Sequence, residues 1–182
     1  MFTPLFYFFS ASSEASSFFV SVFSVLSDST PAIAAAQKND VIYLCRDWEE
    51  NAAVSKPVTL DLNGYTLSCS STNEDIIRVS RSGNLTVKDI GTDGKIDGQN
   101  KNCGFNVKGG TLTLESGSIV NCKTDGDGGA VDVSNTGVTE TPVKYGKFIM
   151  NGGAIMDCTA DDDAGAVDIG SGCTFIMNGG II

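Results

Sequence analysis

Short apolar runs alternate with turn residues along this chain at a regular spacing. The clearest case is KFIMNGGAI at residues 147–155, which returns 27 residues later as TFIMNGGII at 174–182. A weaker copy, TLTLESGSI at 111–119, precedes the first by 36 residues. A repeat of this length with strand-like residues is typical of a solenoid, in which each repeat forms one coil of the chain.

Within each repeat the apolar residues fall on three ladders separated by Gly, Asn, Asp and Ser. Side chains of a strand point alternately to its two faces, so alternate apolar positions predict one buried face per strand. The predicted inward positions of the first ladder are Leu60 and Leu62, Leu85 and Val87, Leu112 and Leu114, Phe148 and Met150, and Phe175 and Met177. Those of the second ladder are Leu67, Ile96, Ile119, Ile155 and Ile182. Those of the third are Ile77 and Val79, Phe105 and Val107, Val131 and Val133, and Val167 and Ile169.

Three short strands per coil predict an all-β fold, a right-handed parallel β-helix over residues 58–182. A β-propeller blade needs about 40 residues or more, and a β-sandwich needs antiparallel hairpins, so the repeat fits neither well. Residues 134–145 are interpreted as an insertion that accounts for the longer spacing of 36 residues. Insertions of this kind form surface loops in solenoids.

The residues before the first ladder divide into a leader and a cap. Pro31 to Gln37 is rich in alanine and begins with proline, which predicts a short helix, and VIYL at 41–44 predicts a strand. We therefore expect residues 31–57 to cap the β-helix, with 47–50 as a polar loop. Residues 1–30 contain no Lys or Arg and are interpreted as a divergent signal peptide or a non-native start. Their apolar runs are shorter than the ~20 residues of a membrane span.

Composition excludes several classes of site. The net charge of -10 argues against nucleic acid as a partner, because phosphates would be repelled. The absence of histidine removes Ser-His-Asp and Cys-His nucleophile systems and His-ligated zinc. The six cysteines include no CxxC pair, which disfavours a zinc site. Cys122 and Cys158 occupy equivalent repeat positions and are interpreted as buried, stacked thiols.

Aspartates in the later loops are the candidate metal ligands. Carboxylates one coil apart repel each other unless they are hydrated or bridged by a cation, and calcium takes about 6–8 oxygen ligands. The aligned pairs Asp125 with Asp161 and Asp127 with Asp163 therefore suggest a calcium site, and Asp132 aligns with Asp168 in the same way. The alternative is that these are solvated loop acids. No catalytic or cofactor-binding residues are predicted, because the only arginines lie in the first two coils, away from these carboxylates.

The segment LDLNGYTL at 60–67 resembles the right-handed β-helix modules of bacterial surface and adhesin-like proteins of the gut Firmicutes type. AIAAAQKNDVIYL at 32–44 is similar to their opening cap. SGNLTVKD at 82–89 and GGAV at 128–131 are similar to segments of their repeats. The resemblance implies the architecture of the pectate-lyase-like fold. The resemblance implies a non-catalytic structural or adhesive module, secreted or at the cell surface, that contacts glycans or a host-surface ligand. The alternative is a polysaccharide lyase or glycoside hydrolase of the pectate-lyase-like type.

Two further expectations concern partners. Trp48 and Tyr65 are candidates for stacking on a sugar, although Trp48 is equally interpretable as a residue that covers the first coil. The last repeat ends at Ile182 with no polar cap after it. A bare coil of this kind predicts that the natural protein has more coils, or that the chain associates end to end. No membrane-spanning segment is expected.

Overall fold

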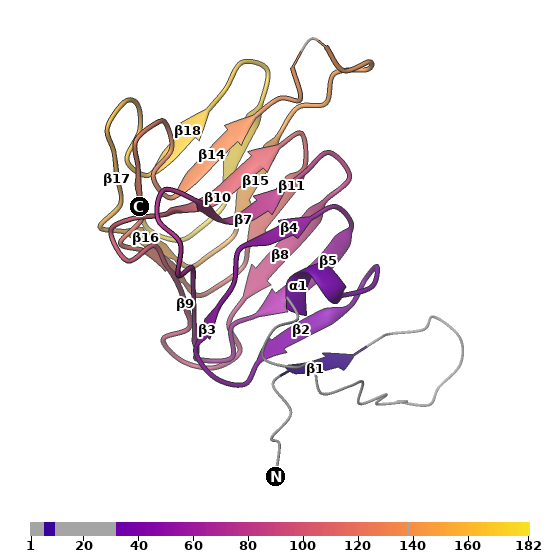
Figure 1. Ribbon diagram of the computed structural model, residues 1–182, viewed down its shortest axis with the longest axis vertical. Helices are drawn as coiled ribbons and strands as arrows, with labels where there is room; N and C mark the ends of the chain where they lie inside the picture. Colours follow the sequence, from indigo (N-terminus) through magenta and orange to yellow (C-terminus); the bar gives the residue numbers. More distant parts are fainter. Residues whose placement is uncertain (1–5, 10–31, 138) are drawn as a thin grey trace.

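A computed structural model describes residues 6–9, 32–137 and 139–182. The chain winds as a right-handed parallel β-helix: in Figure 1 the front strands run from left to right and the rear strands return from right to left as the coils rise. Each coil adds one strand to each of three sheets. The predicted all-β fold class is therefore confirmed.

We name the three sheets by their place in Figure 1. The rear sheet consists of β1 (Phe6–Phe9), β2 (Val41–Leu44), β5 (Pro57–Asp61), β8 (Asn84–Lys88), β11 (Thr111–Leu114), β15 (Lys147–Met150) and β19 (Thr174–Met177). The side sheet consists of β3 (Trp48–Glu49), β6 (Thr66–Ser68), β9 (Lys95–Asp97), β12 (Ser118–Val120) and β16 (Ala154–Met156). The front sheet consists of β4 (Ala52–Val54), β7 (Asp75–Val79), β10 (Cys103–Lys108), β14 (Val131–Ser134) and β18 (Val167–Ile169), and β13 (Lys123–Thr124) pairs with β17 (Thr159–Ala160) beside it.

The core is formed by the inward ladders, whose middle coils are buried. The register of the front sheet confirms the third ladder, and that of the side sheet confirms the second from Leu67 through Ile155. A bridge between Ala154 and Ile181 places Ile182 level with Ile155. Stacking like side chains in this way fills the interior continuously from one coil to the next.

The first ladder is shifted by two residues at its start. The residues level with Leu85 and Val87 are Val58 and Leu60, whereas the sequence-based alignment used Leu60 and Leu62. Leu62 is also fully buried, but it follows β5 and precedes the corner made by Asn63 and its neighbouring glycine. Alternation continues through three apolar positions here, so a shift of two residues leaves the sequence pattern unchanged.

The first coil begins earlier than the sequence pattern indicated. Residues 47–50 were expected to be a polar loop, but Trp48 and Glu49 form β3 and pair with β6. With β2 and β4, this strand extends all three sheets by one coil before Val58. The prediction was wrong because a strand of two residues is too short to show alternation.

A short helix, α1 (Ala32–Ala35), packs against this first coil as predicted for the cap. Glu50 fixes the helix in place although its side chain is buried. Its Oε1 accepts the N–H of Ile33 at 3.1 Å, and its Oε2 accepts the indole N–H of Trp48 at 3.1 Å. Both carboxylate oxygens are thus satisfied, as a buried acid requires.

In β1, residues 6–9 pair antiparallel with β2 at the N-terminal edge of the rear sheet. The rest of the predicted leader lies outside the described residues. Among the described helices, none has the length and apolar character needed to cross a bilayer.

The predicted insertion projects from the corner between β14 and β15 (Figure 1). It contacts a distant coil through Arg81, whose Nη1 lies 3.0 Å from Glu140 Oε2 and whose Nη2 donates to the carbonyl of Pro142 at 3.1 Å. The loop is therefore anchored to the corner after β7 as well as to its own coil.

Candidate functional site

The outer face of the rear sheet carries one β-branched side chain per coil in a straight row. Register places these residues level with one another from each strand to the next. We call them the branched row: Val41, Thr59, Thr86, Thr113, Ile149 and Ile176. Neighbouring strands lie about 4.8 Å apart, so the row extends for roughly 24 Å along the helix axis. β-Branched side chains have few χ1 rotamers, so the side chains of the row are largely preorganised in the unbound protein.

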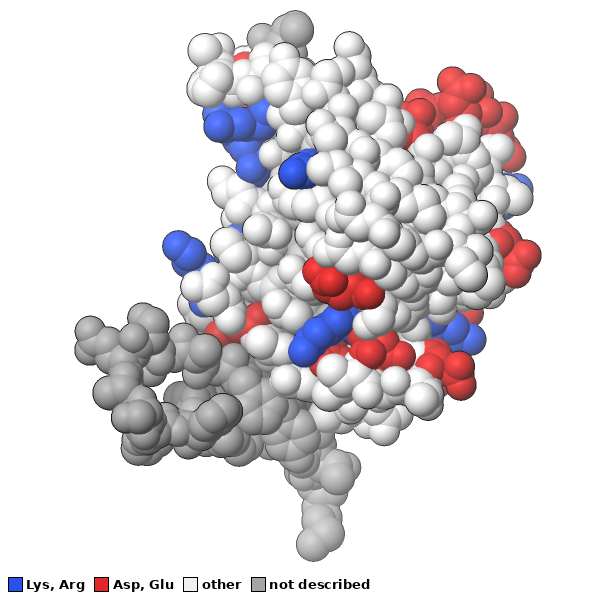
Figure 2. All heavy atoms as spheres, turned by 180° about the vertical axis from the view of Figure 1, so that it is seen from behind, with Lys and Arg blue, Asp and Glu red and all other residues white. Residues whose placement is uncertain are grey.

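A second outward row runs beside the branched row, and four of its five members carry hydrogen-bonding side chains. Its members, level with one another in the same register, are Pro57, Asn84, Thr111, Lys147 and Thr174. Figure 2 views the molecule from the side of the rear sheet and shows a broad central surface with few charged side chains. Acidic side chains gather along one edge of this view and also in its lower centre, where basic side chains lie beside them.

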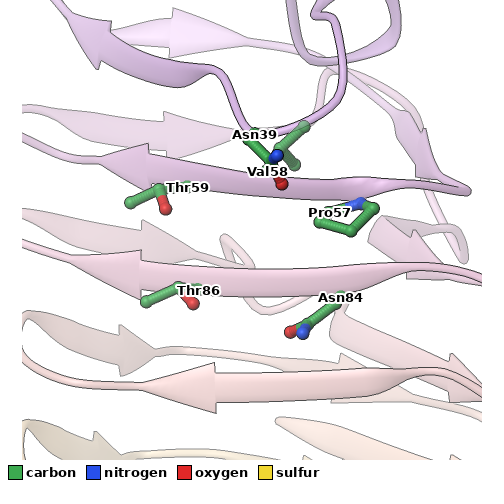
Figure 3. A pocket seen from close by; sticks show the side chains of 6 residues that line it. All are labelled: Asn39, Pro57, Val58, Thr59, Asn84 and Thr86. Atoms are coloured by element: carbon green, nitrogen blue, oxygen red, sulfur yellow. The ribbon is translucent and has the colours of Figure 1, made fainter. Parts of the chain in front are cut away.

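A hollow of about 150 Å³ lies near the N-terminal end of these rows. It is lined by Asn39, Pro57, Val58, Thr59, Asn84 and Thr86. In Figure 3, Thr59 and Thr86 lie one above the other on neighbouring strands, as do Pro57 and Asn84. Pockets for small molecules usually measure about 300–1,000 Å³. The hollow is therefore better suited to one unit of a longer ligand than to an enclosed small molecule.

A ladder of polar contacts follows the C-terminal ends of the same strands. Lys88 Nζ lies 3.2 Å from Asp61 Oδ2 and 5.9 Å from the ring centroid of Tyr43. Further along, Asn151 Nδ2 donates to Glu115 Oε1 at 2.9 Å, and Asn178 Nδ2 donates to Asn151 Oδ1 at 2.8 Å. The two asparagines therefore stack on neighbouring coils, and their side-chain amides bond to Glu115 and to each other.

Asp61 is fully buried and stabilises the corner that follows β8. Its Oδ1 accepts the N–H groups of Asn63 at 3.0 Å and Ile90 at 3.1 Å. Its Oδ2 makes the ion pair with Lys88 described above and accepts no hydrogen bond among the described residues. Neighbouring Asp89 accepts three further backbone N–H groups in the same corner. These acids have a structural role.

The front sheet presents carboxylates on its outer face. Asp132 lies level with Asp168, as the sequence predicted. Burial raises the pKa of Asp132 to about 6, with further contributions from the negative charges of Asp168, Asp75 and Asp127, while Lys108 opposes the shift. This carboxyl group can therefore hold a proton at mildly acidic pH, as a general acid does.

Three of the four predicted calcium ligands already have partners within the protein. Asp125 Oδ2 accepts Asn73 Nδ2 at 2.9 Å, and Asp127 Oδ1 accepts the N–H of Asp163 at 3.2 Å. Lys123 Nζ lies 3.9 Å from Asp161 Oδ1. In the part of the chain that the structure describes, no group of three or more Asp, Glu, Cys or His residues is placed to hold a metal ion. The calcium site at Asp125, Asp127, Asp161 and Asp163 stays a prediction.

Sequence reasoning missed the branched row. It concentrated on the inward positions and on loop aspartates, whereas Thr59, Thr86 and Thr113 are the outward residues between inward ones. The signal was present as LTV and LTL, whose predicted alignment already places Thr86 level with Thr113. Thr59 joins them only through the register observed for β5. Of the two candidate aromatic residues, Trp48 packs against the core and beneath the guanidinium of Arg46, 5.3 Å from its ring centroid. This arrangement favours its interpretation as a covering residue.

No protein-family model, curated protein or solved structure matches the chain.

Proposed function

We propose that this chain is a non-catalytic β-helix module of a secreted or cell-surface protein, and that its branched row contacts a linear glycan. The observation that carries the proposal is the alignment of one stiff, uncharged side chain per coil along the rear sheet. The structural or adhesive role follows from the resemblance of residues 60–67 and 32–44 to bacterial surface modules.

The chemistry of the two rows suits a glycan chain. Methyl groups of the branched row can pack against the C–H faces of sugar rings, while Thr hydroxyls and the amide of Asn84 can bond to sugar hydroxyls. A bound ligand would desolvate few charged side chains, because charged groups are sparse on this face (Figure 2). The side chains lose little rotamer freedom on binding, which lowers the entropic cost of association.

Binding to a panel of soluble polysaccharides tests this proposal. The panel includes neutral xylan, acidic polygalacturonan and peptidoglycan fragments, measured by isothermal titration calorimetry. We expect at least one to bind, and Thr86→Lys combined with Thr113→Lys to weaken that binding about tenfold or more by placing long charged chains on the row. Asn106→Lys is the matched control, because Asn106 is an outward strand residue of similar exposure on the front sheet. Equal losses in both variants, or no binding to any member of the panel, would contradict the proposal.

A polysaccharide lyase or glycoside hydrolase is the second candidate, favoured by one observation. Asp132 and Asp168 lie level on neighbouring strands, and the pKa of Asp132 is raised to about 6. Glycoside hydrolases use two carboxyl groups, one of which holds a proton. Release of reducing ends or unsaturated products from the same panel, abolished by Asp132→Asn, would establish this activity. Binding without turnover would leave the non-catalytic proposal.

A further inference from the structure

Cys122 and Cys158 lie directly side by side on neighbouring coils. Cys122 precedes β13 and Cys158 precedes β17, and these two strands pair in register. The N–H of Thr159 donates to the carbonyl of Cys122 at 2.9 Å, which fixes the two cysteines at the same level. Asn121 and Asp157, the residues before them, both have positive φ, of 51° and 55°. The chain thus turns in the same way into each cysteine.

The spacing of such a pair suits a disulfide. Level residues of paired strands have Cα atoms about 5 Å apart, and disulfides span Cα distances of about 4.4–6.8 Å. Both thiols are free. Each thiol makes weak contacts to carbonyls: Cys122 Sγ to Val120 O at 3.4 Å, and Cys158 Sγ to Met156 O at 3.2 Å and to Ile119 O at 3.9 Å.

The two thiols differ in exposure and acidity. Cys122 is completely buried, whereas Cys158 is partly exposed. The contact with Cys158 and burial raise the pKa of Cys122, and the same contact lowers the pKa of Cys158. Reactive thiols are accessible and have a lowered pKa, often with a second thiol beside them to complete the reaction. Cys158 fits the first role and Cys122 the second.

We propose that Cys122 and Cys158 form a thiol pair that closes to a disulfide between two coils when the protein meets a small-molecule disulfide. The thiolate of Cys158 attacks one sulfur of the oxidant, whose S–S bond breaks, and one small thiolate leaves. Cys122 then loses its proton to that thiolate and attacks Cys158 Sγ, displacing the second small thiol. Two protein thiols are oxidised, and the oxidant is reduced to two thiols.

The crosslink would hold together the coils on either side of the insertion. The chain between Cys122 and Cys158 contains β14, the projecting loop and β15. Closing a covalent loop of this length restricts the unfolded chain and thereby stabilises the folded one. For a domain of this size, we expect the disulfide to raise the melting temperature by roughly 5–10 °C.

Oxidised glutathione, added to the reduced full-length chain, is the probe. After quenching with an alkylating reagent, peptide mass spectrometry is expected to show the Cys122–Cys158 disulfide and four alkylated cysteines. In Cys122→Ala the reaction should stop at a mixed disulfide between Cys158 and glutathione. In Cys158→Ala, Cys122 should remain a thiol, and neither variant should gain melting temperature on oxidation.

Cys173→Ala is the matched control, because Cys173 is the partly exposed cysteine of the last coil and its pKa is raised mainly by burial. It should form the Cys122–Cys158 disulfide as readily as the wild type. A stable mixed disulfide on Cys158 in the wild type would overturn the proposal. So would a disulfide between Cys122 and buried Cys103, or six thiols that stay reduced.

Discussion

The outer faces of the rear and front sheets belong to the same coils but carry different chemistry. The rear face presents the branched row, and Lys88 on this face is paired with Asp61. The front face presents Asp132 and Asp168 level with each other. Below both faces the inward residues of the middle coils are apolar and buried.

The comparison separates what specifies the fold from what differentiates the surface. A solenoid gains its stability from contacts between successive coils, so the inward ladders must continue through every coil. Outward positions lie under no such constraint, because water solvates them whatever their chemistry. Coils of one architecture can therefore carry a sparsely charged face on one sheet and an acidic face on another.

The largest expected difference is between an aspartate placed on the inner face of a strand and one placed on its outer face. Leu112→Asp places an unpaired charge in the core of β11, where Leu112 is 0% exposed. We expect a loss of about 3–5 kcal/mol in unfolding free energy, or failure to fold. Thr113→Asp, one residue further on the outer face, should change it by less than about 1 kcal/mol. Urea unfolding followed by circular dichroism compares them, and similar losses would mean that the register is wrong.

Removing a carboxylate from each face is expected to have opposite effects. Asp61→Ala removes the acceptor of two backbone N–H groups and the partner of Lys88, so we expect a loss of about 2–3 kcal/mol in unfolding free energy. Asp168→Ala removes a negative charge that faces Asp132, and should leave stability unchanged or slightly raised. The same urea titrations measure both variants. A loss of unfolding free energy in Asp168→Ala similar to that in Asp61→Ala would contradict the proposed difference between the two faces.

A smaller effect is expected from the pH dependence of the front face. The pKa of Asp132 is raised in the folded state, so its contribution to stability is full below the ordinary carboxyl pKa of 3.8 and is lost as pH rises through about 6. Asp132→Asn should remove this dependence and stabilise the protein at pH 7 by about 1 kcal/mol, since the partly exposed carboxyl is screened by solvent.

Melting temperatures between pH 4 and pH 8 test this prediction. Parallel curves for the wild type and Asp132→Asn across that range would show that Asp132 titrates normally. The control is Asp89→Asn, because the Asp89 carboxylate accepts backbone N–H groups and belongs to a corner of the rear sheet rather than to the front face.

The smallest expected effect is that of calcium on the four loop aspartates. If Asp125, Asp127, Asp161 and Asp163 bind calcium, millimolar calcium should raise the melting temperature by mass action on the folded state. Magnesium should raise it less, because it requires stricter octahedral geometry. Unchanged melting curves with both ions would leave the solvated-loop interpretation.

Much of the fold was predictable, whereas the candidate site was not. The side and front ladders, from Leu67 and from Ile77 onward, follow from apolar spacing because each coil repeats one pattern. The partners of Asp61 and of Arg81 could not be predicted, because the partner of Arg81 lies in a loop 59 residues away in the sequence. Nothing in the local sequence indicates how such a loop folds back.

By itself, the sequence determined that this protein is a parallel β-helix, since a repeated alternation of buried and exposed positions leaves few other ways to bury the apolar residues. The tertiary structure decided the register at Val58, and with it the place of Thr59 in the branched row. The physical reason is that alternation has a period of two and is unchanged by a shift of two residues. Hydrogen bonds between coils and the geometry of the corners select one register, and register determines which outward side chains become neighbours.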